Sequence, residues 1–416
     1  MTSASELPTR LRQQVHQFLL DSLNPDSELK CDIMHTWGQA EKDYMLSLCK
    51  DKRIFPLLYK RLKSKPQADG YIVDKLGSMH RNNAGRNLKL FSELRQILNA
   101  FHKAGIEVIL LKGSYLAPVV YGDIANRVLR DIDLLIRMEE MIRVLEVMKS
   151  LGYTQRENYA CCQGSPQKLM EFLAGRKHLH PFFKGDIAVE IHATIAGPTD
   201  PQINIDDFWQ RSQTIQMMGC PARVFSPEDF LLHLCLHATF QDIFTNGLLT
   251  VQDIRFFMTK VASRINLNEM LARARQLHME NAVDMTMLLT RRLAGLDSCG
   301  SFFKDARFGN EGELELVAME QMFTGKVSRS YSDFSASTPI QRIKLVFSRW
   351  FVSRHALEYQ YGNLNNVFQV IKAYGMRFRY LLSSHAAGLR SVTSRDSMLH
   401  QTSEQQGKIR DWLKEK

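Results

Sequence analysis

The sequence predicts an α+β fold, with a small mixed β-sheet embedded between N-terminal and C-terminal helical regions. Apolar residues recur with the helical period over residues 9–104 and again from residue 226. Between these regions, from Gly105, the apolar runs become short and rich in branched side chains, which is typical of strands. A chain of 416 residues is long enough for two or three domains.

These patterns divide the chain into four expected parts. Residues 1–104 form an N-terminal helical region, and residues 105–200 form the mixed-sheet core. Residues 201–337 form a helical domain that we expect to wall off the open face of the sheet, with a helix start at Ser226-Pro227. Residues 338–416 form a basic helical region whose Ser- and Gln-rich end we expect to be partly mobile.

The core elements follow from turn residues at their boundaries. Gly105 and Gly113 enclose the first strand, Gly152 ends a helix, and Gly185 lies in the turn of a hairpin. The expected order is strand 106–111, helix 114–122, strand 130–137, helix 138–153, and a hairpin of 178–183 with 187–195.

Composition excludes several classes of protein. Hydrophobic residues make up 44% and charged residues 24%, as in a soluble globular protein, and no apolar run reaches the roughly 18 residues of a membrane span. The start of the chain lacks the layout of a signal peptide. The seven cysteines show no metal-ligand spacing, so we expect free thiols in a reducing, cytoplasmic compartment, and no membrane partner.

Two carboxylates stand one residue apart in an otherwise apolar strand. Because side chains alternate between the faces of a strand, Asp131 and Asp133 point to the same side, about 7 Å apart, while Ile132 points into the core. Neighbouring like charges raise each other's pKa unless a cation lies between them. The pair therefore predicts a site for hard divalent cations, Mg²⁺ or Mn²⁺. Two such ions about 4 Å apart can hold both the attacking and the leaving oxygens of a phosphoryl transfer.

Basic and small residues surround this pair in the sequence. Gly113 and Ser114 follow the preceding strand, where glycine lets the backbone approach a phosphate. Lys112 adds a positive charge, and Arg127 and Arg130 precede the aspartates. We expect these five residues to bind the phosphates of a nucleotide.

A Gly-Ser after one strand and an Asp-x-Asp on the next resembles the nucleotidyltransferases of the DNA polymerase β superfamily. More narrowly, the chain resembles a family of largely uncharacterised bacterial nucleotidyltransferases over about residues 30 to 260. The motifs that carry this resemblance are Leu111-Lys112-Gly113, Arg127, Asp131-Ile132-Asp133-Leu134-Leu135, Leu151-Gly152-Tyr153 and Val189-Glu190-Ile191-His192. Val128 stands where the family often has proline, which removes no expected ligand.

The resemblance implies a metal-dependent transfer of a nucleoside monophosphate from an NTP to an acceptor, with release of pyrophosphate. It implies a third carboxylate from a neighbouring strand, for which Glu190 is the candidate, so Asp131, Asp133 and Glu190 become the expected catalytic and metal-binding residues. His180 and His192 are candidates for lining the nucleotide pocket. The acceptor is not determined, and we favour a small molecule or a polypeptide.

Other interpretations stay open. The chain could be a non-catalytic nucleotide- or RNA-binding partner protein, or a nucleotidyltransferase that acts on tRNA. Thirteen Lys and Arg face five acidic residues after Thr338, with aromatic residues among them, so weak binding of nucleic acid through this region is possible. Finally, five histidines could form a zinc site, although apolar neighbours favour helix packing for the last two: His178, His180, His192, His233 and His237.

Overall fold

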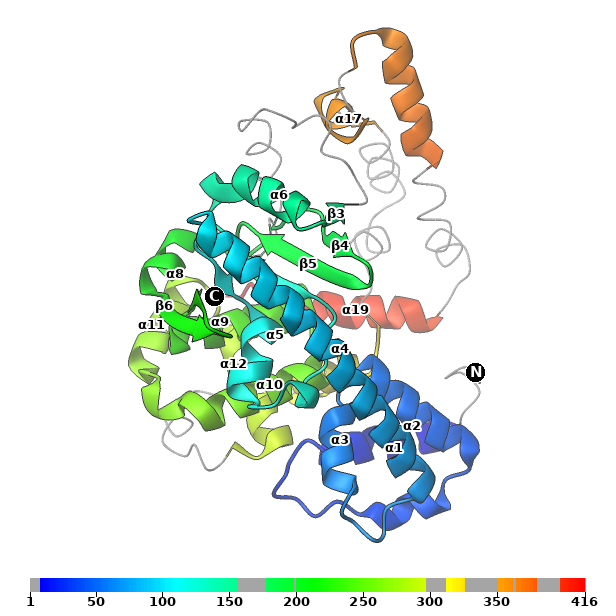
Figure 1. The fold of residues 1–416 in the computed structure, drawn as a ribbon. Helices are drawn as coiled ribbons and strands as arrows, with labels where there is room; N and C mark the ends of the chain where they lie inside the picture. Colours follow the sequence, from blue (N-terminus) through cyan, green and yellow to red (C-terminus); the bar gives the residue numbers. More distant parts are fainter. Residues whose placement is uncertain are drawn as a thin grey trace.

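The computed structural model confirms an α+β protein with a mixed sheet between helical regions (Figure 1). The structure describes residues 8–155, 177–197, 200–296, 312–325, 351–352, 354–361, 364–379 and 397–415. Most of the described elements share one continuous hydrophobic core, which runs from helix α1 to residue Leu413. No helix in this part of the chain is both long and apolar enough to cross a membrane.

The N-terminal region is helical, as predicted. Its elements are α1 (Thr9–Asp21), the 3₁₀ turn η2 (Cys31–Thr36), α2 (Gln39–Asp51), α3 (Phe55–Leu62) and α4 (Gly70–Lys103). Helix α4 starts where the Asp69 side chain accepts a hydrogen bond from the backbone N–H of Ile72. It then runs from the N-terminal helices to the sheet (Figure 1), where Leu94, Ile97 and Phe101 are buried. One long helix thus connects the two regions rigidly.

The sheet has seven strands in the order β3-β4-β5-β2-β1-β7-β6. The strands are β1 (Ile109–Leu110), β2 (Ile132–Leu135), β3 (Thr154–Gln155), β4 (Phe182–Lys184), β5 (Ile187–His192), β6 (Gln213–Met217) and β7 (Cys220–Val224). Strand β2 pairs in parallel with β5 and antiparallel with β1, and β7 pairs in parallel with β1. The predicted hairpin is present as β4–β5, but β1 is shorter than the predicted strand 106–111.

The sheet also continues beyond residue 200, where the sequence predicted only helices. Strands β6 and β7 form an antiparallel hairpin at the edge of the sheet. Three of the five residues of β6 are exposed, so this strand lacks the apolar run that would reveal it in the sequence. The β6–β7 hairpin joins the sheet through the pairing of Arg223 in β7 with Ile109 in β1.

Further helices precede and follow strand β5. Before β5 they are α5 (Lys112–Tyr115), the π-helical turn η3 (Leu116–Val120), η4 (Ile124–Asn126), η5 (Met138–Glu140) and α6 (Met141–Ser150). After β5 they are α8 (Ile205–Arg211), α9 (Pro227–Leu236), the π-helical turn η6 (His237–Gln241), α10 (Gly247–Val261), η7 (Ala262–Arg264), α11 (Leu267–Gln276), α12 (Glu280–Ala294), α14 (Gly312–Gln321), α17 (Arg354–Tyr361) and α19 (Ser397–Trp412). The predicted helix start at residue 226 is present, because Ser226 Oγ accepts from the N–H of Asp229.

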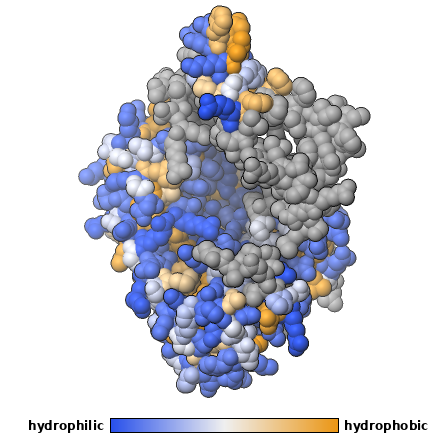
Figure 2. Space-filling model, turned by 90° about the vertical axis from the view of Figure 1, so that its right-hand side faces the viewer, coloured by the Kyte–Doolittle hydropathy of each residue, from blue (hydrophilic) through white to orange (hydrophobic). Residues whose placement is uncertain are grey.

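The C-terminal helix α19 is docked on the protein. Ile409 and Leu413 are buried, and Asn281 donates a hydrogen bond to the carbonyl oxygen of Trp412. The last turns of α19 therefore pack on the fold. Part of the Ser- and Gln-rich segment that we expect to be partly mobile falls in residues 380–396, which lie outside the described part. The face in Figure 2 is largely hydrophilic and is hollowed near its centre, with hydrophobic side chains exposed at its upper end.

Candidate active site

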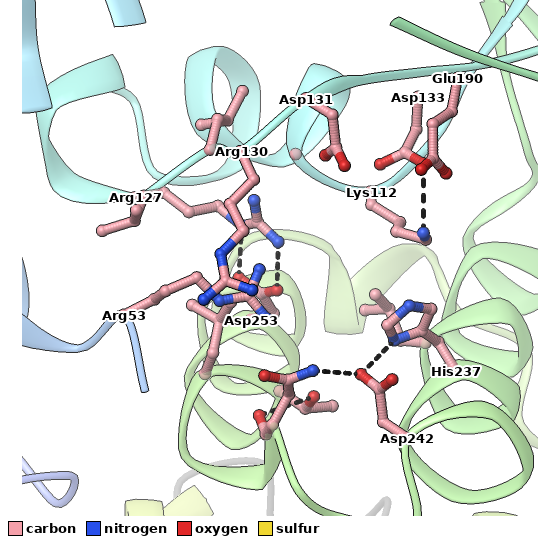
Figure 3. A pocket seen from close by; sticks show the side chains of 17 residues that line it. Arg53, Lys112, Arg127, Arg130, Asp131, Asp133, Glu190, His237, Asp242 and Asp253 are labelled. Atoms are coloured by element: carbon pink, nitrogen blue, oxygen red, sulfur yellow. Dashed lines mark hydrogen bonds and ion pairs between the residues drawn. The ribbon is translucent and has the colours of Figure 1, made fainter. Parts of the chain in front are cut away.

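A cavity of about 250 Å³ lies between the sheet and the helices that follow it (Figure 3). Its lining combines the loop and strand at 127–133, strand β5, helices α9 and α10, and one residue of the N-terminal region, Arg53. Of the residues that the sequence predicted for nucleotide and metal binding, seven line this cavity: Lys112, Gly113, Arg127, Arg130, Asp131, Asp133 and Glu190. The structure thus gathers most of the predicted site in one place.

Asp131, Asp133, Glu190 and Lys112 form one side of the cavity, which we call the carboxylate wall. The parallel register of β2 and β5 pairs Asp133 with Glu190, and Asp131 lies just before β2 (Figure 3). Lys112 Nζ lies 3.2 Å from Asp133 Oδ1. Three carboxylates with one ammonium leave this wall with a surplus of negative charge.

The two aspartates of this wall differ in their electrostatics. Burial alone would raise the pKa of Asp133, but Lys112 and the hydrogen bond from His192 outweigh it and hold this pKa well below its usual range. Burial first, and then the charges of Asp133 and Glu190, raise the pKa of Asp131 to about 7, although Lys112 and Arg53 act in the opposite direction. Asp133 is therefore a carboxylate anion stabilised by Lys112 and His192, while Asp131 has no ion-pair partner of its own among the described residues.

His192 lies behind the carboxylate wall and not on the cavity surface. Its Nε2 is 2.9 Å from Asp133 Oδ1 and 3.6 Å from Glu190 Oε2. Burial lowers the pKa of His192 to about 3, so the ring is neutral and Nε2–H donates to Asp133. Asp133, Glu190 and His192 each offer one ligand atom, all within 4.8 Å of one another. Two carboxylates and an imidazole are a set of ligands that could hold a divalent cation.

Within the described residues this is the one group of three or more potential ligands that meet so closely, and Asp131 lies outside it although it lines the same cavity. The alternative zinc site made of histidines does not form there. His233 is fully buried between aromatic rings of Phe225 and Phe230. His237 instead has its Nδ1 3.2 Å from Asp242 Oδ2.

Two further predicted residues do not reach the cavity. The Ser114 hydroxyl is buried and accepts a hydrogen bond from the backbone N–H of Asp133, so it supports the carboxylate wall from behind. His180 does not line the cavity, and its carbonyl oxygen accepts from Gln155 Nε2. The sequence shows that both residues lie near the predicted motifs along the chain. Whether their side chains point into the cavity depends on tertiary packing.

The opposite side of the cavity, which we call the arginine wall, consists of Arg53, Arg127, Arg130 and Asp253 (Figure 3). Arg127 and Asp253 form a buried two-point ion pair, with Nε–Oδ1 and Nη2–Oδ2 distances of 2.7 Å each. Tyr121 also donates to Asp253 Oδ1 at 2.8 Å. The charge of Arg127 is therefore already matched, which the prediction of a phosphate ligand did not anticipate.

Gly113 is required by the position of Arg127. A Cβ atom built on Gly113 would lie 2.4 Å from Arg127 Nη1, which is far inside contact distance. The lysine before it, Lys112, has a left-handed backbone with φ of 40°, a conformation that costs energy in a residue with a side chain. The Lys112-Gly113 motif thus lines the cavity and also leaves room for the buried guanidinium group of Arg127.

Helix α4 fixes the loop that carries both Arg127 and Arg130. The buried Asn83 and Asn87 donate to the carbonyl oxygens of Ala125 and Arg127. Arg86 Nη2 donates to the carbonyl oxygen of Arg130. A helix of the N-terminal region therefore holds the arginine wall in place through backbone hydrogen bonds.

Several residues that line the cavity were not predicted from the sequence, namely Arg53, Asp242, Asn246 and Asp253. Asp253 had a usable signal, because it stands in a helix that is buried almost all round and a buried acid needs a partner. Arg53 had none, because it lies in a short turn far from the motifs in sequence.

Comparison with known proteins identifies a matching family. Residues 38–295 match the model of the family described as "Uncharacterised nucleotidyltransferase". No curated protein matches. Among solved structures, the chain is similar to the solution structure of the antibiotic-resistance factor ANT(2'')-Ia, at 15% identity and a TM-score of 0.32, over 46% of this chain and 93% of that one. The family match spans more than half of the sequence and contains the motifs of both walls, so this chain belongs to the uncharacterised nucleotidyltransferase family.

Proposed function

We propose that this protein is a metal-dependent nucleotidyltransferase that moves a nucleoside monophosphate from an NTP to an acceptor and releases pyrophosphate. The observation that carries the proposal is the juxtaposition of Asp131, Asp133 and Glu190 across strands β2 and β5 at the surface of one cavity. Membership of the family supports nucleotidyl transfer in general. The free thiols of the described cysteines, Cys31, Cys49, Cys220 and Cys235, suit a cytoplasmic location.

In this proposal, Asp133 and Glu190 hold a divalent cation, with Asp131 completing the negative wall and His192 close behind. A bound Mg²⁺ or Mn²⁺ would supply positive charge to the phosphates and to the attacking oxygen. Glu190, whose side chain is 25% exposed, faces the cavity and accepts the proton of the acceptor hydroxyl, directly or through water. Lys112 interacts with the phosphates from the same wall. The protein thus works by positioning and charge, as is usual for phosphoryl transfer.

The direct test is to incubate the protein with Mg²⁺ or Mn²⁺ and each labelled NTP, and to measure pyrophosphate release and labelling of the protein itself. Glu190→Gln should reduce turnover by orders of magnitude. Asp186→Asn is the matched control on the turn before β5, because its side chain is 66% exposed and faces Arg86. Equal loss in the two variants, or no pyrophosphate from any NTP, would overturn the proposal.

As the acceptor we favour a small molecule or a polypeptide. A non-catalytic nucleotide- or RNA-binding role and a tRNA acceptor are the alternatives. They are distinguished by RNA binding at two salt concentrations, because phosphate contacts weaken steeply with salt. Nanomolar, strongly salt-dependent binding of tRNA would favour the tRNA acceptor.

A further inference from the structure

Arg53 reaches the cavity from the N-terminal helical region, far from the motifs in sequence. It is the middle residue of the three that link helices α2 and α3, between Lys52 and Ile54. Figure 3 shows its side chain converging with those of Arg127 and Arg130 near Asp253. The pKa of Arg53 is lowered, first by burial and then by the positive charges of Arg127 and Arg130. Three guanidinium groups thus converge near Asp253.

Two of these guanidinium groups have no carboxylate partner. Asp253 is engaged by both nitrogens of Arg127. In the part of the chain that the structure describes, no carboxylate lies within 4.0 Å of Arg53 or Arg130, and Arg53 Nε is buried without a hydrogen-bond acceptor. Asp242, on the far side of the cavity, is bonded to His237 and Asn246. Gathering like charges without an anion is unfavourable, so the arrangement points to an anionic ligand.

The backbone at Arg53 supports the same conclusion. Its φ is 62°, in the left-handed region that is unfavourable for a residue with a side chain and that glycine adopts freely. The turn is fixed from the other side, because the buried Lys52 donates to the carbonyl oxygens of Thr245 at 3.2 Å and Thr324 at 2.7 Å. A fold that holds an arginine at this position, where glycine would be more stable, indicates that the side chain has a use.

We propose that Arg53 and Arg130 bind the β- and γ-phosphates of the NTP, so that the N-terminal helical region forms part of the nucleotide site. The inference rests on the proposed nucleotidyl transfer and adds a phosphate-binding residue outside the sequence motifs. The same cavity presents the carboxylate wall opposite the arginine wall. A nucleotide triphosphate with its cation matches both walls, because the cation faces the carboxylates and the remaining phosphate charge faces the arginines.

The test measures binding by calorimetry to the full-length protein without divalent metal, so it does not depend on turnover. The ligands are ATP, AMP and inorganic tripolyphosphate. Arg53→Gln should weaken ATP and tripolyphosphate by about 10- to 100-fold, the range for a lost charge-assisted hydrogen bond, and AMP by less than about twofold. Arg10→Gln is the matched control, because it removes the same charge from an exposed position on α1.

A second variant shows that a loss of binding is not a loss of folding. Arg53→Gly removes the side chain at a left-handed position, so its melting temperature should equal or exceed that of the wild type while ATP affinity falls as in Arg53→Gln. Unchanged ATP affinity in both variants would overturn the proposal. So would an equal loss for AMP and ATP, which would place Arg53 on the α-phosphate or in a purely structural role. If no NTP yields pyrophosphate but tripolyphosphate binding still depends on Arg53, only the enzymatic proposal fails.

Discussion

The two walls of the cavity carry opposite surpluses of charge and are built in different ways. The carboxylate wall has three acids and one lysine, and its residues come from strands β2 and β5 and the turn after β1. The arginine wall has three arginines and one aspartate, drawn from the N-terminal region, the loop at 127–130 and helix α10. One wall is set by strand register, and the other by the meeting of three separate segments.

The surplus charges of the two walls do not form ion pairs with each other across the cavity. Within each wall, one acid–base pair is internally matched: Lys112 with Asp133, and Arg127 with Asp253. The remaining charges, Asp131 and Glu190 on one side and Arg53 and Arg130 on the other, line the cavity without matching each other. A ligand that is a cation at one end and an anion at the other would match both.

The largest expected effect comes from the two aspartates of the carboxylate wall. Asp131→Asn and Asp133→Asn should each reduce pyrophosphate release by about a thousandfold or more, as expected when charge stabilisation is lost. Only Asp133→Asn should also destabilise the fold, by about 3 kcal/mol, because it leaves buried Lys112 poorly matched. Urea unfolding measures the free energy of unfolding of both variants. Equal losses in Asp131→Asn and Asp133→Asn would contradict the prediction.

The matched pair of the arginine wall gives the next largest effect. Arg127→Met should reduce the free energy of unfolding by about 3–5 kcal/mol, because it leaves Asp253 charged and buried without its cation. The double variant Arg127→Met with Asp253→Leu should recover most of this loss, because no unpaired charge remains. If the double variant is as unstable as the single one, the pair is not what stabilises this wall.

Gly113 links the two walls and should show a smaller effect. Gly113→Ala places a methyl group against Arg127 Nη1, so we expect a loss of about 1–3 kcal/mol in stability. Gly85→Ala is the control, because a Cβ there meets nothing within 4 Å and α4 is a helix that alanine favours. The melting temperature should thus decrease for Gly113→Ala, and it should increase or stay unchanged for Gly85→Ala.

The last prediction is a pH dependence that belongs to Asp131. Burial and the neighbouring carboxylates raise its pKa from 3.8 to about 7, so between these values the folded state holds a proton that the unfolded state releases. The stability from this group is complete below about pH 4 and is lost as the pH rises through 7. In metal-free buffer, the melting temperature of Asp131→Asn relative to wild type should therefore increase from pH 5 to pH 8. A difference that stays constant or decreases would contradict the raised pKa.

The local features of the carboxylate wall could be predicted because they are properties of short segments. Alternation along a strand places Asp131 and Asp133 on one side, and the motif resemblance pointed to Glu190, which the register indeed pairs with Asp133. Their proposed roles remain predictions. The β6–β7 hairpin was missed because an exposed edge strand has little apolar periodicity.

The sequence alone determined the α+β class, the strands that carry the acidic residues and the family to which the chain belongs, because these depend on patterns within tens of residues. The tertiary structure decided how the charges are paired. Asp253 neutralises Arg127 from 126 positions away, Ser114 turns its hydroxyl onto the backbone, and Arg53 enters the cavity from another region. Such pairings depend on which segments pack together across the whole chain, and a single sequence does not show these distances.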